Sequence, residues 1–363
     1  MIIEVLYSTH NFPIDNAFIQ GIYIDADIQS LFLKGKMVLE DPTGQYSHYV
    51  TLGEQITINL RRPVDGSLLR SYPLRINKFK KMSDENNPLV VRFLEVEFIS
   101  DWYYLQERKT AAYKGNVSSI ISEVVGKDLF FSGSRKTHIE GSSDEAFVRY
   151  RAGDTQADFI STVVKYGVHE NSPLYAYMDH TSSFCLKSWS SMRTNKLPYI
   201  LSPLKDKEGP SVYAEEGTLL LPMYGYNFSS LADQLSSQYS YSFDTSHIPY
   251  NPPKRVLIDS IEKDSSMVRK ESVPGDGETY HWWINPQDAV GLALHDSNER
   301  DFQLFQLVAL VDSVVARDIH IGNTITVVLP QPESKETGEY VIHKIEEIWT
   351  KDGTFSELYL NKI

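Results

Sequence analysis

The sequence predicts a mainly β protein of the α+β class, with two similar antiparallel β-domains and α+β segments inserted between them. Three observations support this prediction. A short strand signature occurs twice, once near each end of the chain. Apolar and polar residues alternate at both ends, as they do in half-buried strands. Clear helical spacing of apolar residues is confined to the stretch between about 105 and 205.

The repeated signature reads GEQITINLRRP from Gly53 to Pro63 and GNTITVVLPQP from Gly322 to Pro332. After a loop of different length, INKF at 76–79 corresponds to IHKI at 342–345, which begin 23 and 20 residues after the opening Gly. One more β-rich run follows each copy. Runs of Ile, Thr and Val are common in strands, so chance similarity is the alternative explanation. We favour duplication, because the matched spacing extends through three consecutive strands.

Residues 1–104 read as β throughout. Ile56, Ile58 and Leu60 lie on one face of the first signature strand, with polar residues between them. Turn residues occur at 41–44, and the polar stretch Lys80 to Pro88 is expected to be a loop. This pattern is typical of a compact antiparallel barrel or sandwich.

The middle of the chain changes character. Apolar spacing predicts a helix over 117–125, with Asn116 as its N-cap. A second helix is expected over 153–164, capped by Asp154 or Thr155, and Gly167 is expected to end it. Strands at 174–178 and 184–186 flank a turn at 179–181.

Beyond a charged loop at 204–217, the stretches 219–226 and 237–242 are expected to be strands. The prolines between 249 and 253 mark a break, and a mixed stretch runs to residue 300. From Phe302 the chain is β again, and Lys-Asp-Gly-Thr at 351–354 predicts a hairpin turn.

Composition limits the function. A length of 363 residues suggests two to three domains, and a net charge of −13 argues against direct nucleic-acid binding, since phosphate contacts need clustered Lys and Arg. The 22 Tyr, 16 Phe and 5 Trp favour β-structure and large interfaces. The N-terminus lacks the basic start of a signal peptide. The apolar run around 305–315 is too short to span a bilayer. We therefore expect the chain to fold in a reducing cytosol without stable membrane insertion.

The sequence contains no familiar catalytic or nucleotide-binding motif. Cys185 is the single cysteine, and the alternation around it predicts a buried structural thiol rather than a nucleophile. Asp179 and His180 are assigned a turn role rather than metal binding. Asp154 and Asp158 have the spacing of metal ligands, but the Gly and the bidentate Glu of a calcium loop are missing.

Two further groups of residues have the side chains that carbohydrate chemistry uses. His281, Trp282 and Trp283 could form a platform on which sugars stack, although a buried or interface aromatic cluster is the interpretation we favour. Asp296, Glu299 and Asp301 could supply acid and base carboxylates, but an acidic chain makes such groups common by chance. We therefore predict no catalytic, cofactor-binding or metal-binding residues, and no enzyme.

A duplicated β-domain has a geometric use. Three copies of such a chain around an axis give a ring with approximate sixfold symmetry, while the inserted segments obey only threefold symmetry. Edge strands of neighbouring β-domains could pair around this ring. A ring of this kind can join a sixfold tube to a threefold object.

The layout resembles the central baseplate hub proteins of contractile-tailed phages, related to the late control protein D family and to the N-terminal part of secretion-system spike proteins. The resemblance rests on the first β-domain leading into the helix at 116–125, on the helix 154–160 followed by Gly167, and on the closing run from Gly322 to Leu360. It covers most of the chain in layout, and 205–300 matches only loosely. No catalytic residue is carried over from this family.

The resemblance implies a homotrimer, located in the tail baseplate of a virion and made in the host cytoplasm. Its tube domains would form a pseudo-hexameric ring under the tail tube protein and above a trimeric central spike protein. Baseplate wedge and tape measure proteins are further expected partners, and DNA would pass through the lumen without specific binding. The ten Asp and Glu against five Lys and Arg in 301–363 could keep DNA off the wall or simply serve solubility. Since no spike-like repeat or lysozyme motif follows residue 363, the spike and any cell-wall hydrolase are expected to be separate chains.

The expected fold is thus mainly β, with two antiparallel β-barrel tube domains and α+β insert domains. Residues 1–104 form the first tube domain, 105–216 the first insert, 217–245 the first strands of the second tube domain, 246–300 the second insert and 301–363 the remainder. The alternative function is a carbohydrate-binding or carbohydrate-cleaving tail protein that uses Trp282, Trp283 and nearby carboxylates. A third hypothesis is a tail-tube or adaptor protein without hub geometry.

Overall fold

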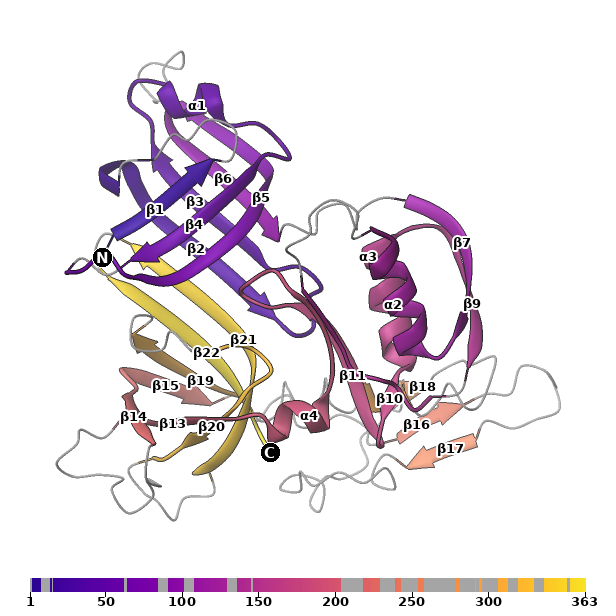
Figure 1. Cartoon of the computed structure of the whole chain (residues 1–363). Helices are drawn as coiled ribbons and strands as arrows, with labels where there is room; N and C mark the ends of the chain where they lie inside the picture. Colours follow the sequence, from indigo (N-terminus) through magenta and orange to yellow (C-terminus); the bar gives the residue numbers. More distant parts are fainter. Residues whose placement is uncertain are drawn as a thin grey trace.

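The computed structural model describes residues 2–7, 14, 16–61, 64–83, 91–100, 108–128, 136–144, 146–203, 218–228, 239–242, 254–257, 279–280, 291, 294–295, 306–312, 319–329, 336–350 and 353–363. Within these residues, thirteen strands form one large curled sheet, and smaller sheets have four, three and two strands (Figure 1). Most of the pairing in the large sheet is antiparallel. The prediction of a mainly β protein is confirmed.

The N-terminal part of the large sheet uses the first hundred residues. Its strands are β1 Ile2–Tyr7, β2 Ile19–Asp27, β3 Lys34–Glu40, β4 Gln55–Arg61, β5 Leu68–Ser83 and β6 Val91–Ser100. They lie in the order β1-β4-β5-β6-β3-β2. A 3-10 turn, η1 Asn16–Phe18, precedes β2, and a short helix, α1 Gln45–Tyr49, lies between β3 and β4.

The C-terminal part of the large sheet begins with β13 Lys196–Ser202, β14 Leu219–Pro222 and β15 Gly225–Phe228. It continues with β19 Gln306–Asp312, β20 Thr324–Val327, β21 Gly338–Thr350 and β22 Thr354–Lys362. Strand β21 joins the two parts, because its first half pairs with β20 and its second half pairs with β2. In Figure 1, β21 and β22 run as a long yellow hairpin from the lower part of the sheet to the upper part.

The two parts repeat the same strand order. Strands β2, β3, β6, β5 and β4 are neighbours in that sequence, and β15, β19, β22, β21 and β20 are neighbours in the same sequence. The backbone N–H of Gly53 donates to the carbonyl of Ile76 at 2.8 Å, and that of Gly322 donates to Ile342 at 2.8 Å. Both glycines have positive φ, 78° and 74°. The two signature stretches therefore begin with the same turn.

The match extends into the following strand. The register of β5 against β6 shifts at Asn77, and the register of β21 against β22 shifts at His343. These are the second residues of the two corresponding stretches, 76–79 and 342–345. A bulge bends and twists the strand that carries it, so both hairpins change direction at the same point.

The first inserted segment packs helices against small sheets. It contains β7 Arg108–Gly115, α2 Val117–Asp128, β8 Thr137–Ile139, β9 Phe147–Thr155, α3 Gln156–Val163 and the 3-10 turn η4 Val164–Tyr166. It continues with β10 Val168–His169, β11 Ser172–Met178, β12 Phe184–Ser188 and α4 Trp189–Thr194. Strands β7 and β9 form a two-stranded ribbon beside α2 and α3 (Figure 1).

Both predicted helices in this segment are confirmed, and so are their caps. The side chain of Asn116 accepts a hydrogen bond from the backbone N–H of Ser119 at 3.0 Å. Of the two candidates for the second cap, the structure has Thr155, whose hydroxyl accepts from the N–H of Asp158 at 3.0 Å. The N-terminal N–H groups of a helix lack partners within it, which explains these positions.

Several expectations about individual segments differ from the structure. Residues 80–83 continue strand β5, where a loop was expected, because Lys81 and Met82 pair with β6 as the preceding residues do. Strand β13, expected within the 105–216 insert, pairs with β20 in the large sheet. Strand β16 Tyr239–Ser242, expected with the second β-domain, pairs with β17 Lys254–Leu257 and β18 Thr279–Tyr280. The loop was expected from the polar composition of residues 80–88, and composition alone does not distinguish a loop from a strand that extends beyond the core.

Buried apolar side chains form two clusters. The first lies among β1 to β6 and extends to α2, α3 and β11, and the second lies among β13, β19, β20, β21 and β22. Trp349, near the end of β21, is fully buried and belongs to the first cluster. The core of the N-terminal part of the sheet is therefore completed by the C-terminal hairpin.

Candidate functional site

The joint between β2 and β21 connects the two parts of the large sheet. Seven residue pairs are in antiparallel register, from Gly21 opposite Thr350 to Asp27 opposite Lys344. Neighbouring strands in such a ladder exchange backbone hydrogen bonds, so the joint is a continuation of the sheet rather than a contact between two surfaces. The relative orientation of the two parts is set by this register.

A buried ion pair lies at the joint. The guanidinium of Arg70 on β5 pairs with the carboxylate of Glu347 on β21, and both side chains are at most 3% exposed. The Tyr72 hydroxyl donates to the same carboxylate at 2.8 Å, and the indole N–H of Trp349 donates to it at 3.0 Å. The rings of Tyr72 and Trp349 lie 5.7 Å apart. Burial raises the pKa of the Tyr72 hydroxyl, so it stays a donor.

Burying two charges costs several kcal/mol each, and their attraction offsets that cost only when the remaining donors and acceptors are also satisfied. Here Tyr72 and Trp349 supply the extra donors to Glu347. A shift of β21 by one residue would turn Glu347 to the other face of the sheet and leave Arg70 buried without it. The pair therefore specifies the register of the joint more than it adds stability.

The hairpin of β11 and β12 in the inserted segment contacts both parts of the large sheet near the joint. The Ser182 hydroxyl, in the turn between β11 and β12, donates to the carbonyl of Pro73 on β5 at 2.8 Å. In the same turn, the ring of His180 stacks on His320, with centroids 3.6 Å apart and planes at 6°. His320 lies just before β20, so this turn touches both parts of the large sheet.

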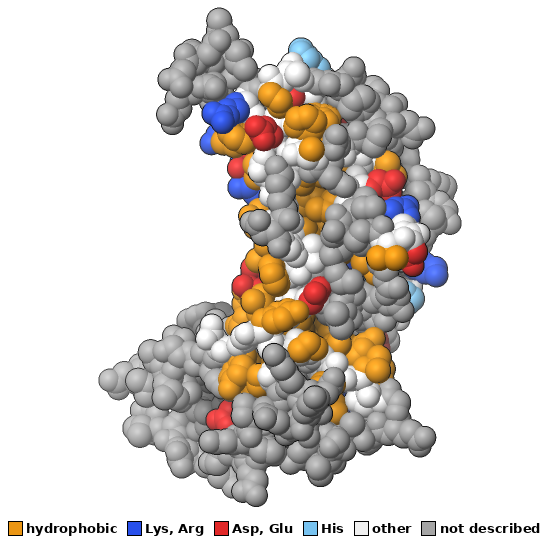
Figure 2. Space-filling view, turned by 90° about the vertical axis from the view of Figure 1, so that its left-hand side faces the viewer, with side chains coloured by type: hydrophobic (Ala, Val, Ile, Leu, Met, Phe, Trp, Pro, Cys, Tyr) orange, Lys and Arg blue, Asp and Glu red, His pale blue; other side chains and the backbone are white. Residues whose placement is uncertain are grey.

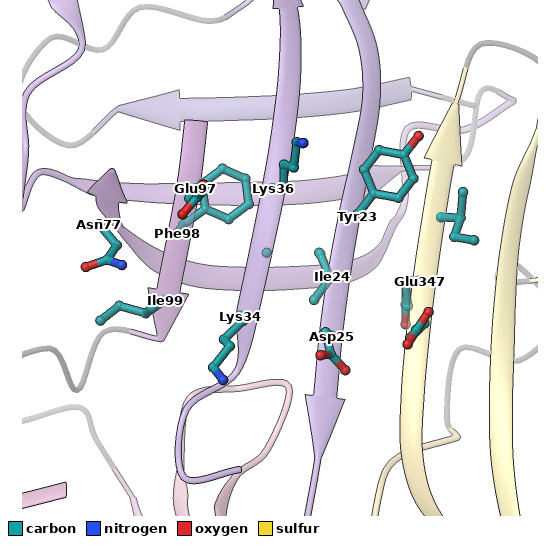
Figure 3. Close-up of a pocket in the computed structure, with 13 residues that line it drawn as sticks. Tyr23, Ile24, Asp25, Lys34, Lys36, Asn77, Glu97, Phe98, Ile99 and Glu347 are labelled. Carbon is teal, nitrogen blue, oxygen red and sulfur yellow. The ribbon is translucent and has the colours of Figure 1, made fainter. Parts of the chain in front are cut away.

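A cavity of about 450 Å³ opens on the sheet where β2, β3, β6 and β21 lie together (Figure 3). Tyr23 and Asp25 contribute from β2, Lys34 and Lys36 from β3, and Glu97 from β6. The cavity thus mixes cations, carboxylates and an aromatic ring. These are groups that can form hydrogen bonds and ion pairs with a polar partner.

Cross-strand ion pairs cover the same face of the sheet. Lys36 pairs with Glu95 at 2.8 Å, and Lys78 pairs with Glu97 at 3.3 Å. Exposed pairs of this kind contribute about 0.2–1 kcal/mol each. Their main consequence is that lysines neutralise part of the acidic charge on this face.

Lys344 forms ion pairs with two carboxylates at the joint itself. The ammonium of Lys344 lies 2.5 Å from Glu346 and 3.7 Å from Asp25. Burial raises the pKa of Asp25 despite the attraction of Lys344. Burial by itself would lower the pKa of Lys344, but the hydrogen bond and charge of Glu346 and the charge of Asp25 together outweigh it, so this pKa is raised. The cation is therefore held in its charged form between the two strands.

A short apolar row also crosses the joint. Tyr23 lies opposite Ile348, and Ile348 lies opposite Phe355 on β22. Tyr23 and Phe355 are 43% and 37% exposed. Figure 2, seen from the left of Figure 1, shows hydrophobic side chains gathered along the middle of a hollowed face with few charges among them.

The candidates from the sequence have structural roles where the structure describes them. Cys185 is buried as predicted, at 3% exposed, and burial raises the pKa of its thiol to about 12. Asp179 accepts hydrogen bonds from the N–H groups of Thr181 and Ser183, as a turn residue does. Asp158 belongs to the cap of α3.

The two remaining groups of candidates lie outside the described residues. They are the aromatic group of His281, Trp282 and Trp283 and the acidic group of Asp296, Glu299 and Asp301. In the part of the chain that the structure describes, no three His, Cys, Asp or Glu side chains are grouped as a metal site would need. No helix among the described residues is long and apolar enough to cross a membrane.

The groups that the sequence analysis missed are Arg70, Tyr72 and Glu347. Tyr72 and Glu347 are 275 positions apart in the chain, and no local pattern links them. Arg70 and Glu347 each occupy a strand position that faces the core, and this could have indicated the ion pair. Charged side chains are almost never fully buried unless they are paired.

The protein is similar to known proteins in its structure, but the comparisons of its sequence found no match. No protein-family profile matches the chain, and no curated protein matches its sequence. The structure is similar to the 43 kDa tail protein of prophage MuSo2 from Shewanella oneidensis, with 11% identity over 99% of this chain and 98% of that chain, and a TM-score of 0.65.

Two further solved structures are similar. A tail protein from Neisseria meningitidis MC58 is 10% identical over 99% of this chain and 96% of that chain, with a TM-score of 0.64. The c3393 protein of E. coli, a type VI secretion component similar to the T4 bacteriophage tail proteins gp27 and gp5, is 10% identical over 99% of this chain and 76% of that chain, with a TM-score of 0.58. The predicted resemblance to phage tail hub proteins is confirmed at the level of the fold.

Proposed function

We propose that the protein is a structural, non-enzymatic hub of a phage tail baseplate. In this proposal three copies form a pseudo-hexameric ring that adapts a sixfold tail tube to a threefold spike and lets DNA pass. The observation that carries it is the repeated unit: strands β2 to β6 share their strand order, opening glycine bond and bulge with strands β15 and β19 to β22. A chain with two such units supplies six to a trimer.

The proposed division follows the sequence analysis, with tube domains at each end and inserts between them. Because β13 pairs with β20, we assign β13 to the second tube domain together with β14 and β15. We assign β16 to the second insert, because its partners are β17 and β18. The described helices, apart from α1 and η1, lie in or beside the inserts.

The proposed location is the tail baseplate of a virion, with the tail tube, the trimeric central spike, baseplate wedge and tape measure proteins as partners. Support comes from the fold shared with tail proteins and with a type VI secretion component. The face that carries the ion pairs of β3, β5 and β6 is the proposed lumen wall. Two of its lysines are paired with carboxylates, which reduces their attraction for phosphates and suits a wall that DNA passes without binding.

The test is the oligomeric state of the full chain. Sedimentation velocity over a range of micromolar concentrations should show a trimer, and averaged electron micrographs should show a ring with a central hole. The same measurements should be repeated in the presence of the spike protein from the same particle. A monomer under both conditions would contradict the ring. A count of subunits other than three in the assembled particle would also exclude it.

A further inference from the structure

The joint within one chain is a template for contact between two chains. Strand β2 of the first unit pairs with the second half of β21 of the second unit. The strand that corresponds to β2 in the second unit is β15, and the strand that corresponds to β21 in the first unit is β5. If each unit uses the same joint with the next one around a ring, β15 must meet β5 of a neighbouring copy.

The edge of β5 that this contact requires is open for pairing. Strand β5 follows β4 up to Arg75 and then runs on to Ser83 along β6 alone. Among the described residues, no strand covers the β4-side edge of β5 from Asn77 to Ser83. The matching half of β21 is covered by β2. Open edges invite pairing with another chain, and lysines at this edge are a common protection against wrong partners.

The register follows from the two bulges. Aligning Ile76 with Ile342 places Lys81 of β5 at the position of Glu347 in β21, and Glu336 at the position of Arg70. Within the chain, Arg70 and Glu347 form the buried ion pair of the joint. At the corresponding joint between copies, the cation and the anion are exchanged: a glutamate stands where the arginine was, and a lysine stands where the glutamate was.

Lys81 has the orientation that this exchange needs. It lies opposite Leu94, a fully buried residue of β6, so it stands on the core side of the strand. Glu347 lies on the core side of β21 in the same way, opposite the buried Ser356. Lys81 and Glu336 are both exposed in the single chain. Each would be desolvated only when the edge of β5 is covered.

From these positions we infer that β15 of one copy pairs antiparallel with residues 77–83 of β5 in the next copy, and that Glu336 of the first copy pairs with Lys81 of the second. The inference rests on the proposed ring and specifies how its three contacts between copies are made. The alignment alone places Lys81 and Glu336 opposite each other, and their charges are opposite. Complementary charges of this kind orient two partners when they bind. The contact is head-to-tail, so it does not end in a two-copy pair, and a rotation of about 120° between copies closes it into the proposed ring.

The experiment uses charge reversal in the full chain, followed by sedimentation velocity. Lys81→Glu alone and Glu336→Lys alone should each weaken assembly at least about tenfold, because like charges then face each other. The double variant should restore much of the lost affinity. Lys80→Glu is the matched control, since it makes the same charge change one residue away on the opposite face and should leave assembly nearly unchanged.

The outcomes separate the inference from the ring itself. Weakening by both single variants with restoration in the double variant supports the pair. If the unaltered chain forms trimers but neither single variant weakens them, the ring stands and this register is wrong. If Lys80→Glu weakens assembly as much as Lys81→Glu and the double variant restores nothing, the specific pair is also refuted. If the unaltered chain does not assemble even with the spike, the proposed ring is refuted, and the contact inferred here is refuted with it.

Discussion

The two glycine turns that open β4 and β20 have the same backbone and different surroundings. Gly53 has φ 78°, and a side chain at this position would meet no atom within 4 Å. Gly322 has φ 74°, but a side chain there would overlap the hydroxyl of Tyr177 and approach Met192. Tyr177 and Met192 belong to β11 and α4 of the inserted segment. The second turn is enclosed by the insert, and the first is open.

This difference shows which features a repeat preserves. Strand order, the opening turn and the bulge are backbone features, and they recur in both units. The surroundings differ because the inserted segment packs against the second unit at Gly322 and contacts the first unit at Pro73. Equivalent positions should therefore respond differently to the same substitution, and the following predictions test this from the largest expected effect to the smallest.

Loss of the buried carboxylate should have the largest effect. Glu347→Ala leaves Arg70 buried without its ion-pair partner, and breaking a buried pair typically costs about 3–5 kcal/mol. Urea denaturation followed by tryptophan fluorescence measures the free energy of unfolding. Trp349 lies against the altered position and reports on it directly.

The matched control for this variant is Glu95→Ala, which removes the carboxylate of an ion pair on the outer face. Its loss should cost at most about 1 kcal/mol, because exposed pairs are screened by water. Equal costs for the two variants would mean that the joint does not depend on the Arg70–Glu347 pair.

The two glycines should rank next. Gly53→Ala should cost about 1–2 kcal/mol, the price of a left-handed backbone with a Cβ. Gly322→Ala should cost a further 1–3 kcal/mol or so, because Tyr177 must move. Thermal unfolding of both variants in parallel measures the difference. A Gly53 variant that is the less stable of the two would contradict the enclosed turn.

The two bulges should differ in their response to pH. Burial lowers the pKa of His343 to about 3 from an ordinary 6.5. The unfolded chain takes up a proton below pH 6.5 and the folded chain does not, so the free energy of unfolding falls as the pH falls through this range. Between pH 6.5 and pH 5 the loss is about 2 kcal/mol. His343→Asn, which copies Asn77 of the other bulge, should remove this part of the pH dependence.

The pH profile, and not the stability at one pH, is the measurement here. The variant also removes part of a buried ring and should be less stable at neutral pH. Urea midpoints of both proteins between pH 5 and pH 7.5 give the two slopes. Parallel slopes would show that His343 does not account for the acid sensitivity.

The sequence predicted the features that depend on local patterns. Asn116 was recognised as a cap, and Thr155 as one of two candidates for the other, because a polar side chain precedes helical spacing. The burial of Cys185 followed from strand alternation. The repeat was visible because its opening glycine and the stretches 76–79 and 342–345 keep their spacing. These signals lie within one or two elements of each other.

The features that were missed depend on pairing between distant segments. Nothing near Glu347 indicates that its partner is Arg70, and residues 80–83 look like a loop because their strand leaves the core. The parallel pairing of β13 with β20 joins segments more than a hundred residues apart. Helix α1 depends on Asp41, a buried carboxylate that accepts from the N–H of Ser47 at 2.8 Å. None of these partners is fixed by residue type alone.

The shared strand β21 also has a consequence for the order of synthesis. At about 5–20 residues per second, a ribosome needs roughly 15 to 65 seconds to proceed from the end of β2 to the end of β21. During that interval the nascent N-terminal unit lacks Trp349 in its core and has no cover for the edge of β2. Its last contacts span more than three hundred residues, which makes them slow to form. Completion of the first unit therefore waits for the last strands of the chain, and an early stop in translation would leave an incomplete core rather than a finished half.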